Sequence, residues 1–354
     1  MRIYSLVGSL LVAVLLVSAG EIPKPAVSVA IPTGAALELL FTRSEDTGGS
    51  LEGPAVAPDG SIYFSDIPFG KNLGRILRFD PKTKETTVFA KDSRKSNGLV
   101  FDSEGRMIAC EGADFGGRQI SRWDIKTGKR STIVDNYMGK KFNSPNDLCL
   151  DRKGRIYFSD PRYVGHESRE LTRQAVYRLD NDGSLIEITH EVAKPNGIVL
   201  SPDERTLYVG DHDNGADRTD PGATPPSPGT MRVYAFPLGS DGKISGRRRT
   251  VIDFGNEKGV DGITVDRQGN LYLTAHRQTA PGVIIVDPNG KEIGFIPTSS
   301  KHQKGDDPKS PLFGLPTNLE FGIAGEADML YITVDVRLYR IRLKTKGYHV
   351  QYPN

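Results

Sequence analysis

The sequence predicts an all-β fold, a six-bladed β-propeller of four-stranded antiparallel blades. Three observations lead to this prediction: one phrase recurs six times, each phrase contains two alternating strands joined by a turn, and further strands follow it. Four-stranded units repeating every ~40–65 residues are typical of propeller blades. The length of 354 residues suggests two or three domains, but six blades fill residues 21–354 as one domain.

Each phrase begins with an oxygen-bearing residue and continues as an apolar alternating run, a turn and a second apolar run. The turns are rich in Asp and Gly, as in Pro58-Asp59-Gly60, which is typical of β-hairpins. The starts of successive phrases lie 45 to 65 residues apart. The six phrases begin at Glu52, Asn97, Asn146, Asn196, Asp261 and Asn318.

The outer strands of the blades follow the phrases. Residues 74–90 and 119–135 each have the pattern of a second hairpin. After the last phrase only one apolar run remains, residues 336–344, so the sixth blade lacks an outer strand. Because an incomplete blade would leave a bare strand edge, we expect residues 36–42 to close the ring. Residues beyond Gly347 are expected to contribute to the same edge.

Composition and charge exclude several classes of protein. Hydrophobic residues make up 37% and charged residues 25% of the chain, which is typical of a soluble globular protein and not of a transporter. The net charge is +2 with both signs scattered, so no basic surface for nucleic acid is expected. The sequence contains no nucleophile-elbow, P-loop, zincin or dinucleotide-binding motif.

The first twenty residues have the pattern of a signal peptide. Arg2 precedes an uncharged apolar run, Leu6–Val17, and small residues follow at 18–20. We therefore expect export, to the periplasm or the medium, and no membrane association after cleavage. An uncleaved membrane anchor is the alternative. In an oxidising compartment Cys110 and Cys149 could pair, although two buried free thiols are equally consistent with the sequence.

The six phrase starts all carry a side-chain oxygen, and the propeller fold brings them together around its axis. Asn and Asp also begin turns, because their side chains form hydrogen bonds to the nearby backbone. This alternative would explain an Asn or Asp at any single phrase start. Convergence of Glu52 and Asp261, however, requires a cation to offset the repulsion of two carboxylates. Hard oxygen donors without Cys or paired His fit Ca²⁺ better than Zn²⁺.

Five short motifs, in register with the blade period, resemble the SMP-30/gluconolactonase/LRE-like family of six-bladed propellers. The resemblance covers nearly all of the chain after the signal peptide. The motifs are EGP at Glu52, NSPNDL at Asn143–Leu148, KPNG at Lys194–Gly197, VDGI at Val260–Ile263 and TNLEFG at Thr317–Gly322.

The resemblance implies one catalytic divalent cation on the axis, most commonly Ca²⁺, with Zn²⁺ and Mg²⁺ as alternatives. By motif its ligands are Glu52, Asn146, Asn196 and Asp261. Asn97 and Asn318 fall outside the family's usual ligand set, so we expect them to line the channel or to lie around the ligands without contacting the ion. The family's activity is hydrolysis of lactones such as glucono-1,5-lactone, so a small-molecule lactone is the expected substrate. Asp261 can act both as a ligand and as the general base toward water.

The connections that follow the second strand of each blade should border the site, because that strand returns to the axial residues. They are Ile67–Leu73, Gly112–Arg118, Pro161–Gln174, His212–Thr230 and Arg277–Gly282. The segment 215–229 is rich in Pro and Gly and is expected to be a lid or a mobile loop. Candidates for substrate binding are Asn97, Arg162, Tyr163, His166, His212 and His276.

Three of these candidates have a structural alternative. Arg162 and His166 could belong to an ordinary solvated loop, and His276 could be a buried structural histidine. The leading hypothesis is an exported Ca²⁺-dependent lactonase. A related ester or phosphotriester hydrolase is the nearest alternative, and a ligand-binding propeller with a structural calcium ion is the alternative from another class.

Overall fold

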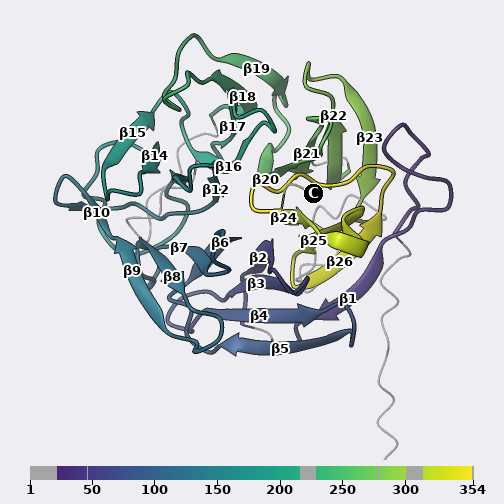
Figure 1. The fold of residues 1–354 in the computed structure, drawn as a ribbon, viewed down its shortest axis with the longest axis horizontal. Helices are drawn as coiled ribbons and strands as arrows, with labels where there is room; N and C mark the ends of the chain where they lie inside the picture. Colours follow the sequence, from purple (N-terminus) through teal and green to yellow (C-terminus); the bar gives the residue numbers. More distant parts are fainter. Residues whose placement is uncertain (1–21, 46, 216–228, 278–279, 300–313, 353–354) are drawn as a thin grey trace, which may run out of the picture.

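The structure, a computed structural model, confirms the predicted propeller. It describes residues 22–45, 47–215, 229–277, 280–299 and 314–352. Six four-stranded antiparallel sheets surround a central axis (Figure 1). The predicted signal peptide and most of the segment 215–229 lie outside the described residues.

The first three blades are numbered in chain order, and in each the strands are hydrogen-bonded in sequence from the axis outward. Blade 1 contains β2 (Ser50–Val56), β3 (Ile62–Ile67), β4 (Arg75–Asp80) and β5 (Glu85–Ala90). Blade 2 contains β6 (Ser96–Phe101), β7 (Met107–Glu111), β8 (Gln119–Trp123) and β9 (Arg130–Val134). Blade 3 contains β12 (Leu148–Leu150), β13 (Ile156–Asp160), β14 (Ala175–Leu179) and β15 (Leu185–Thr189).

The last three blades repeat this arrangement. Blade 4 contains β16 (Pro195–Leu200), β17 (Thr206–His212), β18 (Met231–Pro237) and β19 (Arg249–Asp253). Blade 5 contains β20 (Val260–Val265), β21 (Leu271–Ala275), β22 (Gly282–Val286) and β23 (Glu292–Pro297). Blade 6 contains β24 (Pro316–Phe321), β25 (Met329–Val334), β26 (Arg337–Arg342) and β1 (Glu38–Thr42).

The N-terminal strand closes the ring as predicted. β1 pairs antiparallel with β26 and forms the outer edge of blade 6 (Figure 1). Two elements were not predicted from the sequence: a short hairpin before blade 3, β10 (Asn136–Tyr137) with β11 (Lys140–Lys141), and a 3₁₀ helix, η1 (Ala324–Glu326). Both are too short to produce a periodic pattern of hydrophobic residues.

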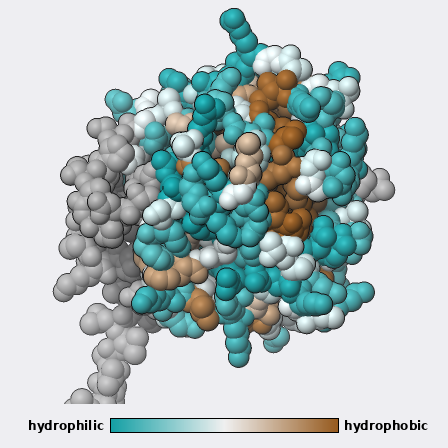
Figure 2. Space-filling view, turned by 90° about the vertical axis from the view of Figure 1, so that its left-hand side faces the viewer, coloured by the Kyte–Doolittle hydropathy of each residue, from teal (hydrophilic) through white to brown (hydrophobic). Residues whose placement is uncertain are grey.

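The hydrophobic core is divided into six layers, one between each pair of neighbouring blades. The layer between blades 1 and 6, for example, packs Phe64 and Phe79 of blade 1 against Tyr331 and Leu338 of blade 6. The side of the ring seen in Figure 2 is mostly hydrophilic, with one hydrophobic strip exposed on it. Among the described residues, no helix is long and apolar enough to span a membrane.

The two cysteines are not paired in this structure. Cys110 is fully buried in the layer between blades 2 and 3, whereas Cys149 packs beside the layer between blades 3 and 4. Both thiols are free. Of the two arrangements that the sequence left open, the structure has the free thiols.

The C-terminal tail does not extend the outer edge of blade 6, so that expectation was wrong. Its first residues instead cross to blade 5, where Gly347 bridges Asp266 and Tyr348 N–H donates to the Val265 carbonyl oxygen at 3.1 Å. Residues 348–351 then line a small cavity around the axis together with Asp147 and Asn318. The tail therefore covers one end of the central channel.

Candidate active site on the propeller axis

The axial residues lie on irregular segments of the innermost strands. In five of the six blades the pairing of the first two strands shifts register where the phrase begins, for example between Glu52 and Ala55 and between Val260 and Ile263. Such a bulge turns a side chain out of the normal alternation. It can thus direct a polar side chain toward the channel while the rest of the strand packs in the core.

Hydroxyl groups on the second strands satisfy the backbone of these bulges. Thr274 Oγ1 accepts a hydrogen bond from Gly262 N–H at 2.7 Å and lies 3.1 Å from the Gly262 carbonyl oxygen and 3.0 Å from that of Thr317. Ser65, Ser159 and Thr333 make comparable bonds in blades 1, 3 and 6. The small hydroxyl residue near the end of these phrases therefore stabilises the segment that carries the axial side chain.

Glycine after the axial residue lets neighbouring blades approach closely. A Cβ at Gly98 would lie 2.8 Å from the Asn146 carbonyl oxygen, and one at Gly262 would lie 2.3 Å from Asn318 Oδ1. No larger residue fits there without moving the next blade. In the dipeptides Asn97-Gly98 and Asp261-Gly262, the first residue therefore faces the site and the glycine allows the neighbouring blades to pack.

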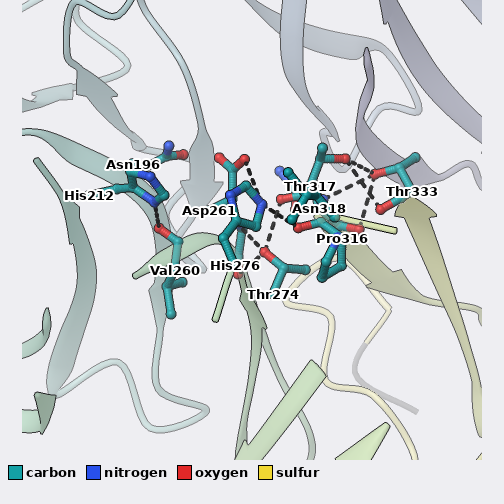
Figure 3. Close-up of polar contacts among 12 residues, drawn as sticks. Asn196, His212, Val260, Asp261, Thr274, His276, Pro316, Thr317, Asn318 and Thr333 are labelled. Atoms are coloured by element: carbon teal, nitrogen blue, oxygen red, sulfur yellow. Dashed lines mark hydrogen bonds and ion pairs between the residues drawn. The ribbon is translucent and has the colours of Figure 1, made fainter. Parts of the chain in front are cut away.

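Five of the six phrase starts line one cavity of about 320 Å³ at one end of the channel. The sixth, Asn318, lines the smaller cavity at the other end, beneath the C-terminal tail. Figure 3 shows Asn196, His212, Asp261 and His276 side by side at the larger cavity. The phrase starts that line it are Glu52, Asn97, Asn146, Asn196 and Asp261.

The carboxyl groups at the axis are costly to ionise. Burial, followed by repulsion from Asp261 and Asp147, raises the pKa of Glu52 well above its usual value. Burial likewise raises the pKa of Asp261 to about 7, as it does that of Asp147. Three buried acids around one axis favour binding of a cation in this region.

The histidines beside the axis are held in the neutral form. His276 Nε2 lies 2.8 Å from the Pro316 carbonyl oxygen and 3.5 Å from Asp261 Oδ2 (Figure 3). His212 Nδ1 lies 3.1 Å from the Val260 carbonyl oxygen, and the two rings meet edge to face at 5.4 Å. Burial lowers the pKa of His212 to about 4 and that of His276 to about 3. At neutral pH neither imidazole competes with a cation for the carboxylates.

Tyr163 completes this side of the cavity. Its hydroxyl accepts a hydrogen bond from Asn196 Nδ2 at 3.2 Å and donates a long one to the Lys194 carbonyl oxygen at 3.5 Å, which a substrate oxygen can replace. Its ring meets that of His212 edge to face. Burial raises the pKa of the Tyr163 hydroxyl well above its usual value, so this group remains protonated. It can donate a hydrogen bond to a substrate oxygen.

Two of the candidate substrate-binding residues do not line the cavity. Arg162 is fully buried, and its guanidinium donates to the carbonyl oxygens of Asn143 (2.6 Å) and Glu167, so it fixes the loop instead of facing a substrate. His166 stacks on Phe115, with 3.9 Å between the ring centroids. The predictions that placed Asn97, Tyr163, His212 and His276 near the axial site agree with the lining of the cavity.

Several lining residues were missed because they lie on irregular loops. Four of the five predicted loops reach the cavity, but no periodic pattern in an irregular loop indicates which of its side chains turn inward. Within the described part of the chain, the segment 277–282 contributes no lining residue. The missed residues include Phe69, Lys95, Asp114, Asn214 and Lys258.

The side chains gathered at the axis carry hard oxygen donors. Glu52 and Asp261 offer carboxylates, and Asn146 and Asn196 offer amide oxygens. Among the described residues, Asn97 Oδ1 is buried without a hydrogen-bond partner, so it is a further oxygen able to face an electropositive group. No group of three or more His, Cys, Asp or Glu side chains suited to a metal occurs among the described residues. The set therefore fits an oxygen-preferring ion such as Ca²⁺ better than Zn²⁺.

Together, the fold and the cavity define a six-bladed propeller with an acid and amide site on its axis. The chain belongs to the SMP-30/gluconolactonase/LRE-like family, whose model matches residues 51–333. It is 32% identical over 316 residues to a gluconolactonase of Zymomonas mobilis (84% of this chain, 79% of the relative). It is 27% identical over 303 residues to a pentonolactonase of Haloferax volcanii (83% and 85%). The solved structure of a gluconolactonase from Xanthomonas campestris superposes with a TM-score of 0.69 at 28% identity (92% and 98%).

Proposed function

We propose that this protein is a lactonase that opens the ring of a sugar lactone with the help of a divalent cation on the propeller axis. Lactone hydrolysis is supported by relatives named gluconolactonase and pentonolactonase that align along most of the chain. The observation that carries the proposal is the single cavity in which Glu52, Asn146, Asn196 and Asp261 meet. The cavity and these relatives together support a site for hydrolysis better than they support an ion with a purely structural role.

Glu52, Asn146, Asn196 and Asp261 would hold the cation, and the two carboxylates would balance the charge of Ca²⁺. Such an ion supplies Lewis-acid polarisation of the lactone carbonyl and stabilises negative charge on its oxygen. Zn²⁺ and Mg²⁺ are the alternatives that the experiment below separates from Ca²⁺.

The chain's own residues orient the reactants and move the proton. Asp261 is proposed to take a proton from the attacking water, and the imidazole of His276, 3.5 Å from Oδ2, restrains its carboxylate. Tyr163 O–H can donate to a ring hydroxyl of the substrate. Water adds across the acyl C–O bond, and the ring oxygen leaves with a proton to give a hydroxy acid.

We further propose that the protein is exported. The support is the apolar run Leu6–Val17 after Arg2, followed by small residues. Fractionation of cells that express the full chain should recover a mature form, shortened by about twenty residues, outside the cytoplasm. Recovery of the full-length chain in the membrane would instead support an anchor.

The decisive experiment measures hydrolysis of glucono-1,5-lactone, a pentonolactone, an aryl ester and an organophosphate ester. The mature protein is assayed as purified, after chelation, and after addition of Ca²⁺, Mg²⁺ or Zn²⁺. We expect lactone turnover that is lost on chelation and restored by Ca²⁺. Turnover of only the ester or the phosphotriester would favour the alternative hydrolase. No turnover, with calcium still raising the unfolding temperature, would favour a binding protein.

A further inference from the structure

Exposed apolar side chains gather on one side of the cavity mouth. Phe69 is 61% exposed, Phe115 46% and Val164 39%. They lie on the connections that follow β3, β7 and β13, in three consecutive blades, and Phe69 and Val164 also line the cavity. Large exposed apolar side chains that continue into a cavity are typical of a binding surface.

Phe115 is fixed in its exposed position. Asp114 and Phe115 both have positive φ angles, 62° and 69°, which are unfavourable for residues other than glycine. The carboxylate of Glu167 accepts the backbone N–H of Asp114 at 3.1 Å and that of Phe115 at 2.8 Å. The ring of His166 stacks on Phe115 at an interplanar angle of 28°. The fold thus maintains a strained backbone that keeps an aromatic ring at the surface.

The loop of Phe69 is attached to the same structure. Gly70 N–H donates to Asp114 Oδ2 at 2.8 Å, and Phe69 N–H donates to the Thr47 carbonyl oxygen at 3.2 Å. Lys71 Nζ lies 5.8 Å from the centre of the Phe115 ring. Three loops from three blades are therefore connected. We call the surface formed by Phe69, Phe115, Val164 and the ring of His166 the apolar wall.

The polar groups of the cavity are sufficient to bind the polar lactone ring. The apolar wall is therefore available for another part of the substrate. The axial end carries carboxylates and amides, and on blade 5 the exposed Lys258 faces the cavity near His212 and His276. A lactone ring bound by polar groups at the axis would direct a ring substituent toward the mouth. Because Phe69 and Val164 belong to both regions, a substituent can pass from the axis to the apolar wall without entering bulk water.

We infer that the apolar wall binds an alkyl substituent of the lactone and that it determines specificity outside the ring. This inference rests on the proposed lactonase activity and extends its substrates to lactones with an apolar chain. Because the apolar wall is already rigid, the protein loses little conformational entropy when the alkyl substituent binds. The binding free energy of the substituent should therefore appear mainly as a lower KM.

The test compares δ-valerolactone, δ-hexalactone, δ-octalactone and δ-decalactone, in which the alkyl substituent lengthens on a constant ring. For the wild type we expect kcat/KM to rise along the series, by at most about fourfold for each methylene that becomes buried. In Phe69→Ala and Phe115→Ala the ratio of kcat/KM for δ-decalactone to that for δ-valerolactone should fall about tenfold. A tenfold loss equals about 1.4 kcal/mol, slightly less than full burial of a Phe side chain provides, as expected for a ring at the cavity mouth that stays partly exposed.

Leu39→Ala is the matched control, because Leu39 is 52% exposed on the outer strand of blade 6, on a strand that does not line the cavity. It should retain the wild-type ratio. If the wild type hydrolyses glucono-1,5-lactone but shows a flat alkyl series, the inference is wrong and the proposed function stands. If no lactone is hydrolysed, both are wrong. A flat series together with binding to phosphatidylcholine vesicles that Phe115→Ala abolishes would assign the wall to a membrane surface instead.

Discussion

At the scale of single residues, the axial carboxyls oppose folding unless a cation is bound. Glu52 is buried near Asp261, and both have raised pKa values. Glu52→Gln removes a group that is costly to ionise, so in chelator at pH 8 we expect an unfolding temperature about 1–2 °C higher than that of the wild type, equivalent to ~1 kcal/mol for a domain of this size. Differential scanning fluorimetry measures this shift.

Millimolar calcium should reverse that order. The proposed ion would bind only the folded chain and should stabilise the wild type by mass action, whereas Glu52→Gln lacks one of the proposed ligand charges and should gain little. Glu45→Gln provides the control, since the side chain of Glu45 is 53% exposed and bonds to Arg75. An equal calcium-induced shift in the wild type and in Glu52→Gln would contradict the assignment of Glu52 as a ligand.

At the scale of elements, the bulges of the inner strands depend on hydroxyl groups of the second strands. Thr274→Val removes the acceptor of Gly262 N–H and leaves that buried donor unsatisfied. We expect a loss of about 1–3 kcal/mol in the free energy of unfolding, together with weaker calcium binding through Asp261. Urea unfolding and isothermal titration calorimetry check the two effects. Thr86→Val is the control, because Thr86 Oγ1 is buried without a hydrogen-bond partner among the described residues, so its removal leaves no other group unsatisfied and should not destabilise the fold.

The closing strand depends on a buried ion pair. Arg43, directly after β1, donates to Asp66 of blade 1 at 2.6 Å, and both side chains are almost inaccessible to solvent. Arg43→Met leaves Asp66 with Arg75 as its remaining cation and should cost about 3 kcal/mol in urea unfolding. Arg342→Met on the adjacent β26 removes a solvent-exposed pair with Asp328 and should cost less than about 1 kcal/mol. Similar losses of unfolding free energy in the two variants would show that the Arg43–Asp66 pair does not contribute specially to closing the ring.

These elements also show why the sequence predicted the fold better than the site. The phrases predict β2 with β3 or β20 with β21 because alternation, turn and glycine are local properties of the chain. Glu52 and Asp261 could be placed at the axis because they stand at equivalent points of the repeat. By contrast, Phe69 and Lys258 lie on connections outside the repeated phrases, so no local pattern predicts that they line the cavity. Neither alternative for Arg162, substrate binding or a solvated loop, included its burial, because burial of a loop arginine has no local signal in the sequence.

At the scale of the whole molecule, the C-terminal tail joins distant blades across one end of the channel. Tyr348 packs beside the layer between blades 4 and 5, Val350 beside that between blades 2 and 3, and Tyr352 beside that between blades 1 and 6. His349 is buried between these contacts, and its Nε2 lies 3.2 Å from the Gly322 carbonyl oxygen. Protonation of this one imidazole therefore affects the association of several blades.

The last prediction concerns the acid stability of the ring. Burial lowers the pKa of His349 to about 4, against about 6.5 for an unfolded histidine. Between these values the unfolded chain binds the proton and the folded chain does not, so His349 destabilises the fold as pH falls from 6.5 toward 4. The neighbouring Glu320, 3.9 Å away, does not pair with a charged imidazole, because burial raises its pKa to about 8 and keeps it protonated. The uptake of this proton stabilises the fold as pH falls, but it is common to the wild type and His349→Gln and cancels in their comparison. From pH 7.5 to pH 5 the wild type should lose about 2 kcal/mol more than His349→Gln in urea unfolding with calcium present. Parallel pH profiles for the two proteins would show that the tail opens before His349 is protonated, and that the end of the channel is not closed under these conditions.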